Sequence, residues 1–186
     1  KIIYTTIFLL SQTNKMKKKI CFIVSTPFTA KAFLLKHFEV LSVKYDIFLV
    51  ANFDGFDLSE FENIPVTIKH IPIVRSIHVI KDLKALFLLK SYLGKMQFNA
   101  IHSVTPKAGL IAMLAGKLGG VKNRIHIFTG QGWHTKKGVF KIILMLLDRI
   151  ISKCATIVLV DGHSQRNFLI EHNIIKKEHS FVIGKG

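Results

Sequence analysis

Short runs of β-forming apolar residues alternate along this chain with longer segments whose apolar side chains recur every three or four residues. The run at 20–25 is continuously apolar, as expected for a central parallel strand covered on both faces. Further strands are predicted at 46–51, 66–71, 99–103, 156–160 and 180–183, with another opening the segment 123–137. Helices are predicted at 30–43, 78–96, 106–118, 139–153 and 163–172. This alternation with short links predicts an α/β fold with a doubly wound, mostly parallel Rossmann-like sheet.

The N-terminal residues 1–15 differ in character from the rest of the chain. An apolar stretch after Lys1 resembles a short signal sequence, but no cleavage site of small residues follows it. We therefore interpret 1–15 as an extraneous or disordered extension, Met16 as the natural start and 16–186 as one domain. No apolar run approaches the roughly 20 residues that are needed to cross a bilayer.

The chain is strongly basic, with 27 Lys and Arg against 11 Asp and Glu and a net charge of +16. Such a balance predicts an anionic partner, which could be nucleic acid, an anionic membrane or a phosphorylated substrate. Its two cysteines show no C-x-x-C spacing and its nine histidines show no ligand spacing with carboxylates. We therefore expect a reducing cytoplasm, no metal and no cofactor.

Two turns at predicted strand ends carry the candidate chemistry. In the first, Gly130 and Gly132 can supply positive φ and present their neighbours at the carboxyl end of a strand, where open α/β sheets bind ligands. The indole of Trp133 could hold a sugar ring by its apolar face. Alternatively, Trp133 only packs against the top of the sheet. The candidate substrate-binding residues of this turn are Thr129, Gln131, Trp133 and Thr135, beside His134.

The second turn joins the strand 99–103 to the helix that Pro106 begins. Hydroxyl groups, free amides and a lysine at this helix start could bind a hydroxyl or phosphate group. Thr105 could instead be a plain N-cap, and His102 could be a core histidine. The candidates here are His102, Ser103, Thr105 and Lys107, and Thr26 follows the first strand at the same edge. The segment 25–30 contains no glycine, which argues against a dinucleotide-binding dehydrogenase, and no P-loop is present.

Five stretches in order resemble the N-terminal half of family 4 glycosyltransferases with the GT-B fold, of the kind that builds bacterial surface polysaccharides. They are K-K-I-C-F-I-V-S-T, A-I-H-S-V-T-P-K-A-G-L-I-A-M-L-A-G, I-F-T-G-Q-G-W-H-T, V-D-G-H-S-Q-R-N-F-L-I and F-V-I-G-K-G. They cover nearly everything from Met16 onward. The glycine-rich turn that often follows the first strand in that family is missing at 25–29.

The resemblance implies that this chain is the acceptor-binding half of a retaining enzyme, one half of a GT-B architecture. A missing C-terminal domain beyond Gly186 would bind the nucleotide sugar, so we expect the fragment alone to be inactive. His134 best matches the family histidine that faces the reacting sugar, and is the catalytic candidate. The expected partners are a nucleotide sugar and a lipid-linked or saccharide acceptor.

The alternative function is a non-catalytic basic α/β module that binds an anionic membrane or nucleic acid. Nucleic acid is disfavoured because the lysines lie between apolar stripes, without the exposed aromatic residues of a stacking platform.

The segment 136–153 is the part of the sequence that bears on whether the protein contacts a membrane. As a helix it has one narrow polar stripe, formed by Lys141, Asp148 and Ser152, and is otherwise apolar. We expect such a helix to be nearly wholly buried, under the sheet and a neighbouring helix or the missing domain. Alternatively, its outer side and the basic helix 78–96 rest on an anionic leaflet. On that interpretation the protein is cytoplasmic and peripheral at the inner face of the membrane.

Overall fold

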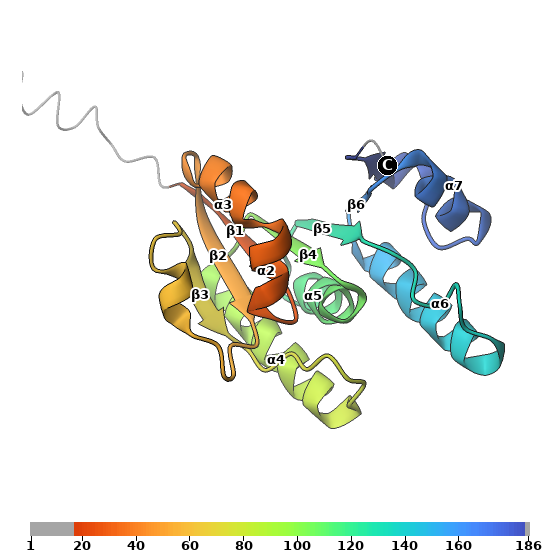
Figure 1. Ribbon diagram of the computed structural model, residues 1–186, viewed down its shortest axis with the longest axis horizontal. Helices are drawn as coiled ribbons and strands as arrows, with labels where there is room; N and C mark the ends of the chain where they lie inside the picture. Colours follow the sequence, from red (N-terminus) through yellow and green to blue (C-terminus); the bar gives the residue numbers. More distant parts are fainter. Residues whose placement is uncertain (1–16, 185–186) are drawn as a thin grey trace, which may run out of the picture.

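The computed structural model describes residues 17–184. Within this range seven strands form one parallel sheet in the order β3-β2-β1-β4-β5-β6-β7 (Figure 1). The strands are β1 (Lys18–Ile23), β2 (Tyr45–Ala51), β3 (Thr67–His70), β4 (Ala100–Val104), β5 (Asn123–Phe128), β6 (Ile157–Val160) and β7 (Ser180–Val182). The predicted extension 1–15 and the predicted start at Met16 lie outside the described residues.

Helices connect consecutive strands and cover both faces of the sheet, which confirms the predicted doubly wound fold. They are α2 (Pro27–Phe33), α3 (Leu35–Ser42), α4 (Val79–Met96), α5 (Pro106–Leu118), α6 (Gly138–Cys154) and α7 (His163–Glu171). The strand order reverses direction between β1 and β4, which are neighbours in the sheet. In open α/β sheets the crevice at this reversal, outside the carboxyl ends of the strands, is the usual ligand site.

The core has two parts, one on each face of the sheet. Phe22 and Leu49 point towards α2 and α3, where the ring of Phe22 meets that of Phe38 edge to face at 5.2 Å. Ile23 and Val50 point to the opposite face and pack with buried residues of α4, α5, α6 and α7. Alternating burial on both faces explains why β1 and β2 are continuously apolar in sequence.

The predicted helix 30–43 is wrong in one respect, because the chain forms two helices that meet at Leu34. Leu34 has φ −118° and ψ −11°, and its side chain is buried against the sheet. The break lets α2 begin at Pro27, directly after the first strand, at the position in a helix where proline is best tolerated.

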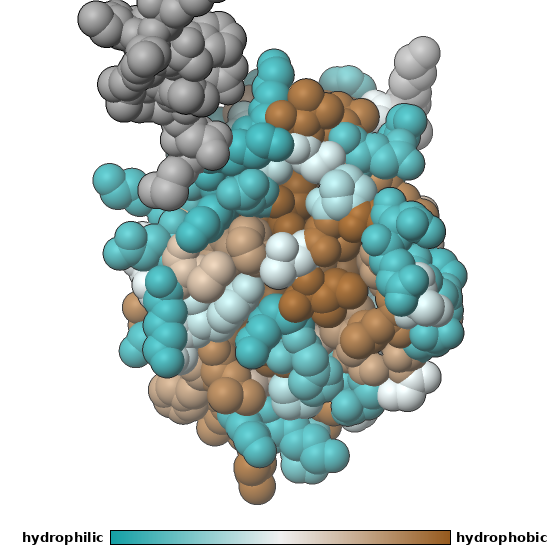
Figure 2. Space-filling view, turned by 90° about the vertical axis from the view of Figure 1, so that its left-hand side faces the viewer, coloured by the Kyte–Doolittle hydropathy of each residue, from teal (hydrophilic) through white to brown (hydrophobic). Residues whose placement is uncertain are grey.

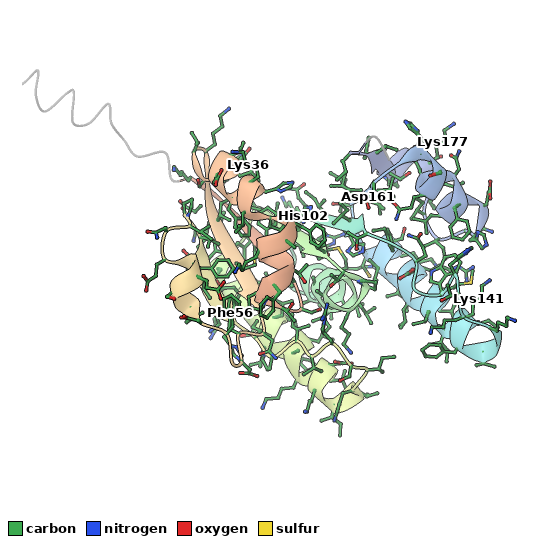
Figure 3. The ribbon with its side chains drawn as sticks, in the orientation of Figure 1. Lys36, Phe56, His102, Lys141, Asp161 and Lys177 are labelled. Carbon is green, nitrogen blue, oxygen red and sulfur yellow. The ribbon has the colours of Figure 1, made fainter. Side chains whose placement is uncertain are left out.

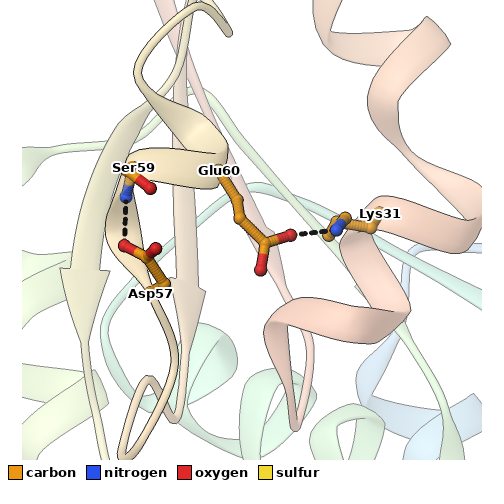
Figure 4. Close-up of polar contacts among 4 residues, drawn as sticks. All are labelled: Lys31, Asp57, Ser59 and Glu60. Carbon is orange, nitrogen blue, oxygen red and sulfur yellow. Dashed lines mark hydrogen bonds and ion pairs between the residues drawn. The ribbon is translucent and has the colours of Figure 1, made fainter.

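The link between β2 and β3 contains a short 3₁₀ helix, η1 (Leu58–Phe61), that the sequence did not predict. Asp57 caps it by accepting a hydrogen bond of 3.0 Å from the Ser59 amide, and Glu60 forms an ion pair with Lys31 of α2 (Figure 4). The ion pair ties the link to the last turn of α2.

The outer faces of α4 and α6 are apolar and exposed. Their first turns extend beyond the sheet at the lower right of Figure 1. In Figure 2 hydrophobic and hydrophilic residues lie side by side at the lower end of the molecule. The exposed apolar residues include Val79, Ile80, Leu83 and Phe87 of α4, and Val139, Phe140, Ile142, Ile143, Leu146 and Ile150 of α6.

Within the described residues, the sheet and the neighbouring helices therefore leave much of the helix 139–153 exposed. Its burial under a further domain stays a prediction. Of its predicted polar stripe, Asp148 turns inward and is buried. Among the helices in residues 17–184, none has the length and apolar character needed to cross a membrane.

Candidate functional site

Hydroxyl groups meet at the point where the strand order reverses. The Oγ of Ser25, after β1, lies 3.4 Å from the Oγ1 of Thr105, after β4. Thr26 is half-buried beside them, with its Oγ1 3.4 Å from the Oγ1 of Thr29. The structure thus brings predicted residues Thr26 and Thr105 to one edge of the sheet, and adds Ser25 and Thr29 to them.

The backbone at Thr105 is strained. Its φ of 75° and ψ of 144° are a conformation that β-branched residues rarely adopt. Although Thr105 occupies the N-cap position of α5, its side chain makes no capping hydrogen bond. The plain N-cap interpretation therefore does not describe this residue. Strain of this kind, about 1–3 kcal/mol per residue, is concentrated at functional sites in proteins.

Lys107 does not extend into this edge as a free cation. Its Nζ forms an ion pair with the Oδ2 of Asp82, from the first turn of α4, and both side chains are largely buried. The second oxygen of that carboxylate, Oδ1, is buried without a hydrogen-bond partner among the described residues. The pair links the N-terminal turns of α4 and α5.

The loop between β5 and α6 carries the other predicted residues. Gly130 has a positive φ of 144°, as predicted, but Gly132 does not. Thr129, His134 and Thr135 are exposed on this loop, at the carboxyl end of β5. The Nε2 of Gln131 is buried and lacks a hydrogen-bond partner among the described residues. His134 and the two threonines are free to contact a substrate.

Trp133 is placed differently from the predicted sugar-stacking platform. It is only 1% exposed, and its ring stacks on Phe168 of α7 at 5.2 Å and 14°. The Nζ of Lys141 lies 5.7 Å from the centre of the indole ring. A sugar cannot reach the indole face in this arrangement, so the packing interpretation describes Trp133 correctly.

The indole nitrogen of Trp133 donates a hydrogen bond of 2.8 Å to the Oδ2 of Asp148 in α6. Burial raises the pKa of the Asp148 carboxyl to about 6, and the hydrogen bond from Trp133 acts in the opposite direction. Together the two side chains join the loop that carries His134 to the second half of α6.

His102 and Ser103 lie within β4 and not at its edge, so their predicted substrate-binding role does not fit their positions. His102 packs against Phe22 on the face covered by α2 and α3, and burial lowers its pKa to about 4. In Figure 3 it lies beside α2, far from Lys141 on α6. Ser103 is fully buried on the opposite face, where its Oγ lies 2.9 Å from the Nδ1 of His126.

One apolar cavity of about 270 Å³ opens beside this edge of the sheet. It lies between the segment leading into α4, the first turns of α5, the loop at Trp133 and the inner face of α6. Asp82, Lys107 and Asp148 line it together with leucine and isoleucine side chains. Within the described residues, no three histidine, cysteine, aspartate or glutamate side chains come together in a way that could hold a metal ion.

Sequence reasoning missed Asp82 and Asp148 as members of this region. Each is the single carboxylate in an otherwise apolar and basic helix. A lone acid in such a helix requires a partner when it is buried, and this signal could have identified both residues.

Comparison with known proteins gives two sequence relatives and no matching family model. The chain is 32% identical over 142 residues to the capsular polysaccharide biosynthesis glycosyltransferase CapM of Staphylococcus aureus, which covers 76% of this chain and 36% of CapM. It is 26% identical over 155 residues to the UDP-Gal:alpha-D-GlcNAc-diphosphoundecaprenol alpha-1,3-galactosyltransferase of Escherichia coli, covering 82% of this chain and 40% of that enzyme. The chain thus spans less than half the length of either relative.

Two bacterial proteins of known structure share this fold. UDP-N-acetylglucosamine 2-epimerase from Rickettsia bellii matches 91% of this chain and 45% of its own, at a TM-score of 0.68 and 14% identity. MurG from Acinetobacter baumannii matches 91% of this chain and 45% of its own, at a TM-score of 0.56 and 16% identity. These likenesses confirm the Rossmann-like fold of a GT-B half.

Proposed function

We propose that this chain is the acceptor-binding half of a retaining glycosyltransferase that acts in the synthesis of a bacterial surface polysaccharide. The observation that carries the proposal is the 32% identity to CapM over 142 residues. The E. coli relative is named for a saccharide acceptor on diphosphoundecaprenol. We assign the same class of acceptor, a lipid-linked saccharide, to this chain, with a nucleotide sugar as the donor.

The exposed loop after β5 supplies the proposed catalytic residue. His134 is exposed, and its ring meets that of Phe168 edge to face, 5.3 Å between ring centres. From this position it can orient the reacting sugar without itself changing charge. Transfer of a glycosyl group passes through an oxocarbenium-like transition state and releases a diphosphate, so positioned polar groups lower the barrier.

The polar groups at the strand ends are the proposed contacts to the acceptor. Thr26 and Thr105 lie at the reversal of the strand order, and Thr129 and Thr135 lie on the exposed loop. Hydroxyl groups can both donate and accept hydrogen bonds, which suits the hydroxyls of a saccharide. Gln131 adds an amide with an unpaired buried nitrogen.

The donor is the proposed ligand of a second Rossmann-like domain, as the family resemblance implies. Such a domain would hold the nucleotide and stabilise the leaving diphosphate across a cleft from the carboxyl edge of this sheet. A transition-state site that needs both sides cannot be assembled from one. The 186-residue chain alone should therefore transfer no sugar.

A lipid-linked acceptor also suggests where the protein works. Exposed apolar residues cover the outer faces of α4 and α6, and exposed lysines accompany them at 81, 84, 95, 136 and 137. Apolar side chains surrounded by lysines favour adsorption to an anionic leaflet. We propose peripheral association with the inner face of the cytoplasmic membrane.

The experiment that tests the proposal uses a chimera in which this chain replaces the matching part of CapM. We expect it to transfer a labelled sugar from a nucleotide sugar to a polyprenyl-diphosphate saccharide, whereas the chain alone does not. The rival function, a basic binding module, is tested by filter binding to nucleic acid with a salt titration. Tight binding that is lost steeply with salt, with no dependence on sugar nucleotide, would favour the module.

A further inference from the structure

The cavity beside the carboxyl edge of the sheet is lined mainly by hydrocarbon. Its walls include Leu110 of α5 and Leu144, Leu147 and Ile151 of α6, with the buried Trp133 behind them. A volume of about 270 Å³ lies just below the range for small-molecule sites, roughly 300–1,000 Å³. The cavity therefore suits a short apolar segment better than a saccharide.

The charged groups of this cavity restrict where an anion could lie. Asp82 and Asp148 line the cavity, and the negative charge of their carboxylates would repel a phosphate placed deep inside. Lys107 balances Asp82 through their ion pair. Arg75 also lines the cavity but is exposed, and no ion pair or hydrogen bond of its side chain is found among the described residues. An anionic group is thus expected at the mouth of the cavity, beside Arg75.

The surroundings of the cavity connect it to a lipid phase. Exposed apolar residues flank it on both sides, including Ile77 and Ile80 near the start of α4 and Val139 and Ile143 at the start of α6. In Figure 1 these two helix starts extend beyond the sheet in the same direction. These exposed apolar side chains would contact an apolar chain that extends from a membrane to the cavity.

We propose that this cavity binds the isoprenyl segment next to the diphosphate of a polyprenyl-diphosphate lipid, with the diphosphate at Arg75. The proposal rests on the proposed function, because the class of ligand follows from a lipid-linked acceptor. It adds a site that is separate from the hydroxyl groups at the reversal of the strand order. Seating the isoprenyl segment there would hold the attached saccharide close to the loop that carries His134.

Binding to the 186-residue chain can be measured with farnesyl diphosphate as a soluble probe. Trp133 is the only tryptophan and lines the cavity, so its fluorescence reports occupancy directly. We expect saturable binding that is at least about tenfold weaker for inorganic diphosphate, farnesol or dodecyl phosphate, since each lacks part of the ligand.

Pairs of matched variants show where on the protein the probe binds. Leu147→Phe adds bulk to a residue that lines the cavity, whereas Leu146→Phe adds the same bulk to its exposed neighbour. We expect about tenfold or more weaker binding for Leu147→Phe only, because overpacking fills the space that the probe needs. Arg75→Ala should weaken binding of the probe several-fold, in contrast to Lys36→Ala on the exposed surface of α3.

A photoreactive isoprenyl diphosphate tests the same site in the unaltered protein, so the proposal does not depend on a variant that folds. We expect labelling of peptides from 106–110 and 144–151. Labelling elsewhere, wild-type affinity in a folded Leu147→Phe variant, or equal binding of farnesyl diphosphate and dodecyl phosphate would each overturn the proposal. Failure of this proposal is distinct from failure of the proposed function. The cavity can bind the probe although the CapM chimera transfers no sugar, and the chimera can transfer sugar although the cavity does not bind the probe.

Discussion

The indole nitrogen of Trp133 donates a 2.8 Å hydrogen bond to the carboxylate of Asp148, 15 residues later, and both side chains are buried. This bond joins the loop after β5 to α6 from beneath. The loop carries His134 and Thr135 on its exposed side. The bond between Trp133 and Asp148 therefore holds in place the loop that presents the proposed catalytic residue. We therefore propose that Trp133 positions this loop, because its burial does not fit the sugar-stacking role expected from sequence.

Asp148→Asn should stabilise the protein at neutral pH. Burial raises the pKa of Asp148 from 3.8 to about 6 in the folded state. Between about pH 4 and 6 the folded state therefore retains a proton that the unfolded chain has lost. The contribution of this bound proton to the free energy of unfolding falls as pH rises through that window. The amide oxygen of the variant can still accept the bond from Trp133. We expect a gain on the order of 2 kcal/mol at pH 7.5 and little change at pH 4, measured by urea unfolding. Asp148→Leu, which removes the acceptor, should instead destabilise the protein.

Trp133→Ala should lower the free energy of unfolding by about 3–5 kcal/mol, since it opens a large cavity and leaves Asp148 without its donor. Trp133→Phe should lower it less, because stacking on Phe168 can persist. Circular dichroism during thermal unfolding measures both. A folded Trp133→Ala variant of normal stability that binds acceptor poorly would support the stacking role instead.

Acid should destabilise the protein through its buried histidines. Burial lowers the pKa of His102 to about 4 and of His126 to about 3, so the unfolded chain binds protons below pH 6.5 that the folded protein excludes. Stability should therefore fall as pH decreases from 6.5 towards 4, partly offset by Asp148. His126→Gln should reduce this slope in urea unfolding at several pH values, whereas His134→Gln, on the exposed loop, serves as the control. An unchanged slope in His126→Gln would contradict this assignment.

Vesicles test the proposed membrane contact. The chain should sediment with phosphatidylglycerol vesicles at low salt and be released at high salt, since each lysine near an anionic surface contributes about 1 kcal/mol. Replacing Lys136 and Lys137 by glutamine should weaken binding more than replacing Lys36 and Lys177, which lie elsewhere on the surface. Equal binding to neutral vesicles, or none to acidic ones, would count against the proposal.

The fold followed from sequence because each strand and helix carries its own periodic pattern, from the apolar run of β1 to the glycines after α5. The positions of the side chains at the site did not follow from the sequence. Whether Trp133 faces a ligand or the core depends on Phe168 and Asp148, which are distant in sequence and meet it only in the folded chain. The strained backbone of Thr105 likewise has no signal in residue type, because threonine is disfavoured there.

The central claim is that the loop at the carboxyl end of β5 places His134 at the reacting sugar. The most direct measurement is transfer of a labelled sugar by the CapM chimera, compared with the same chimera carrying His134→Ala or the control His163→Ala, which alters an exposed histidine at the start of α7. We predict transfer by the chimera, a loss of about a hundredfold or more in kcat with His134→Ala, and unchanged thermal unfolding in both variants. A folded His134→Ala chimera with full activity, or a folded chimera that binds the nucleotide sugar without transferring it, would contradict the account.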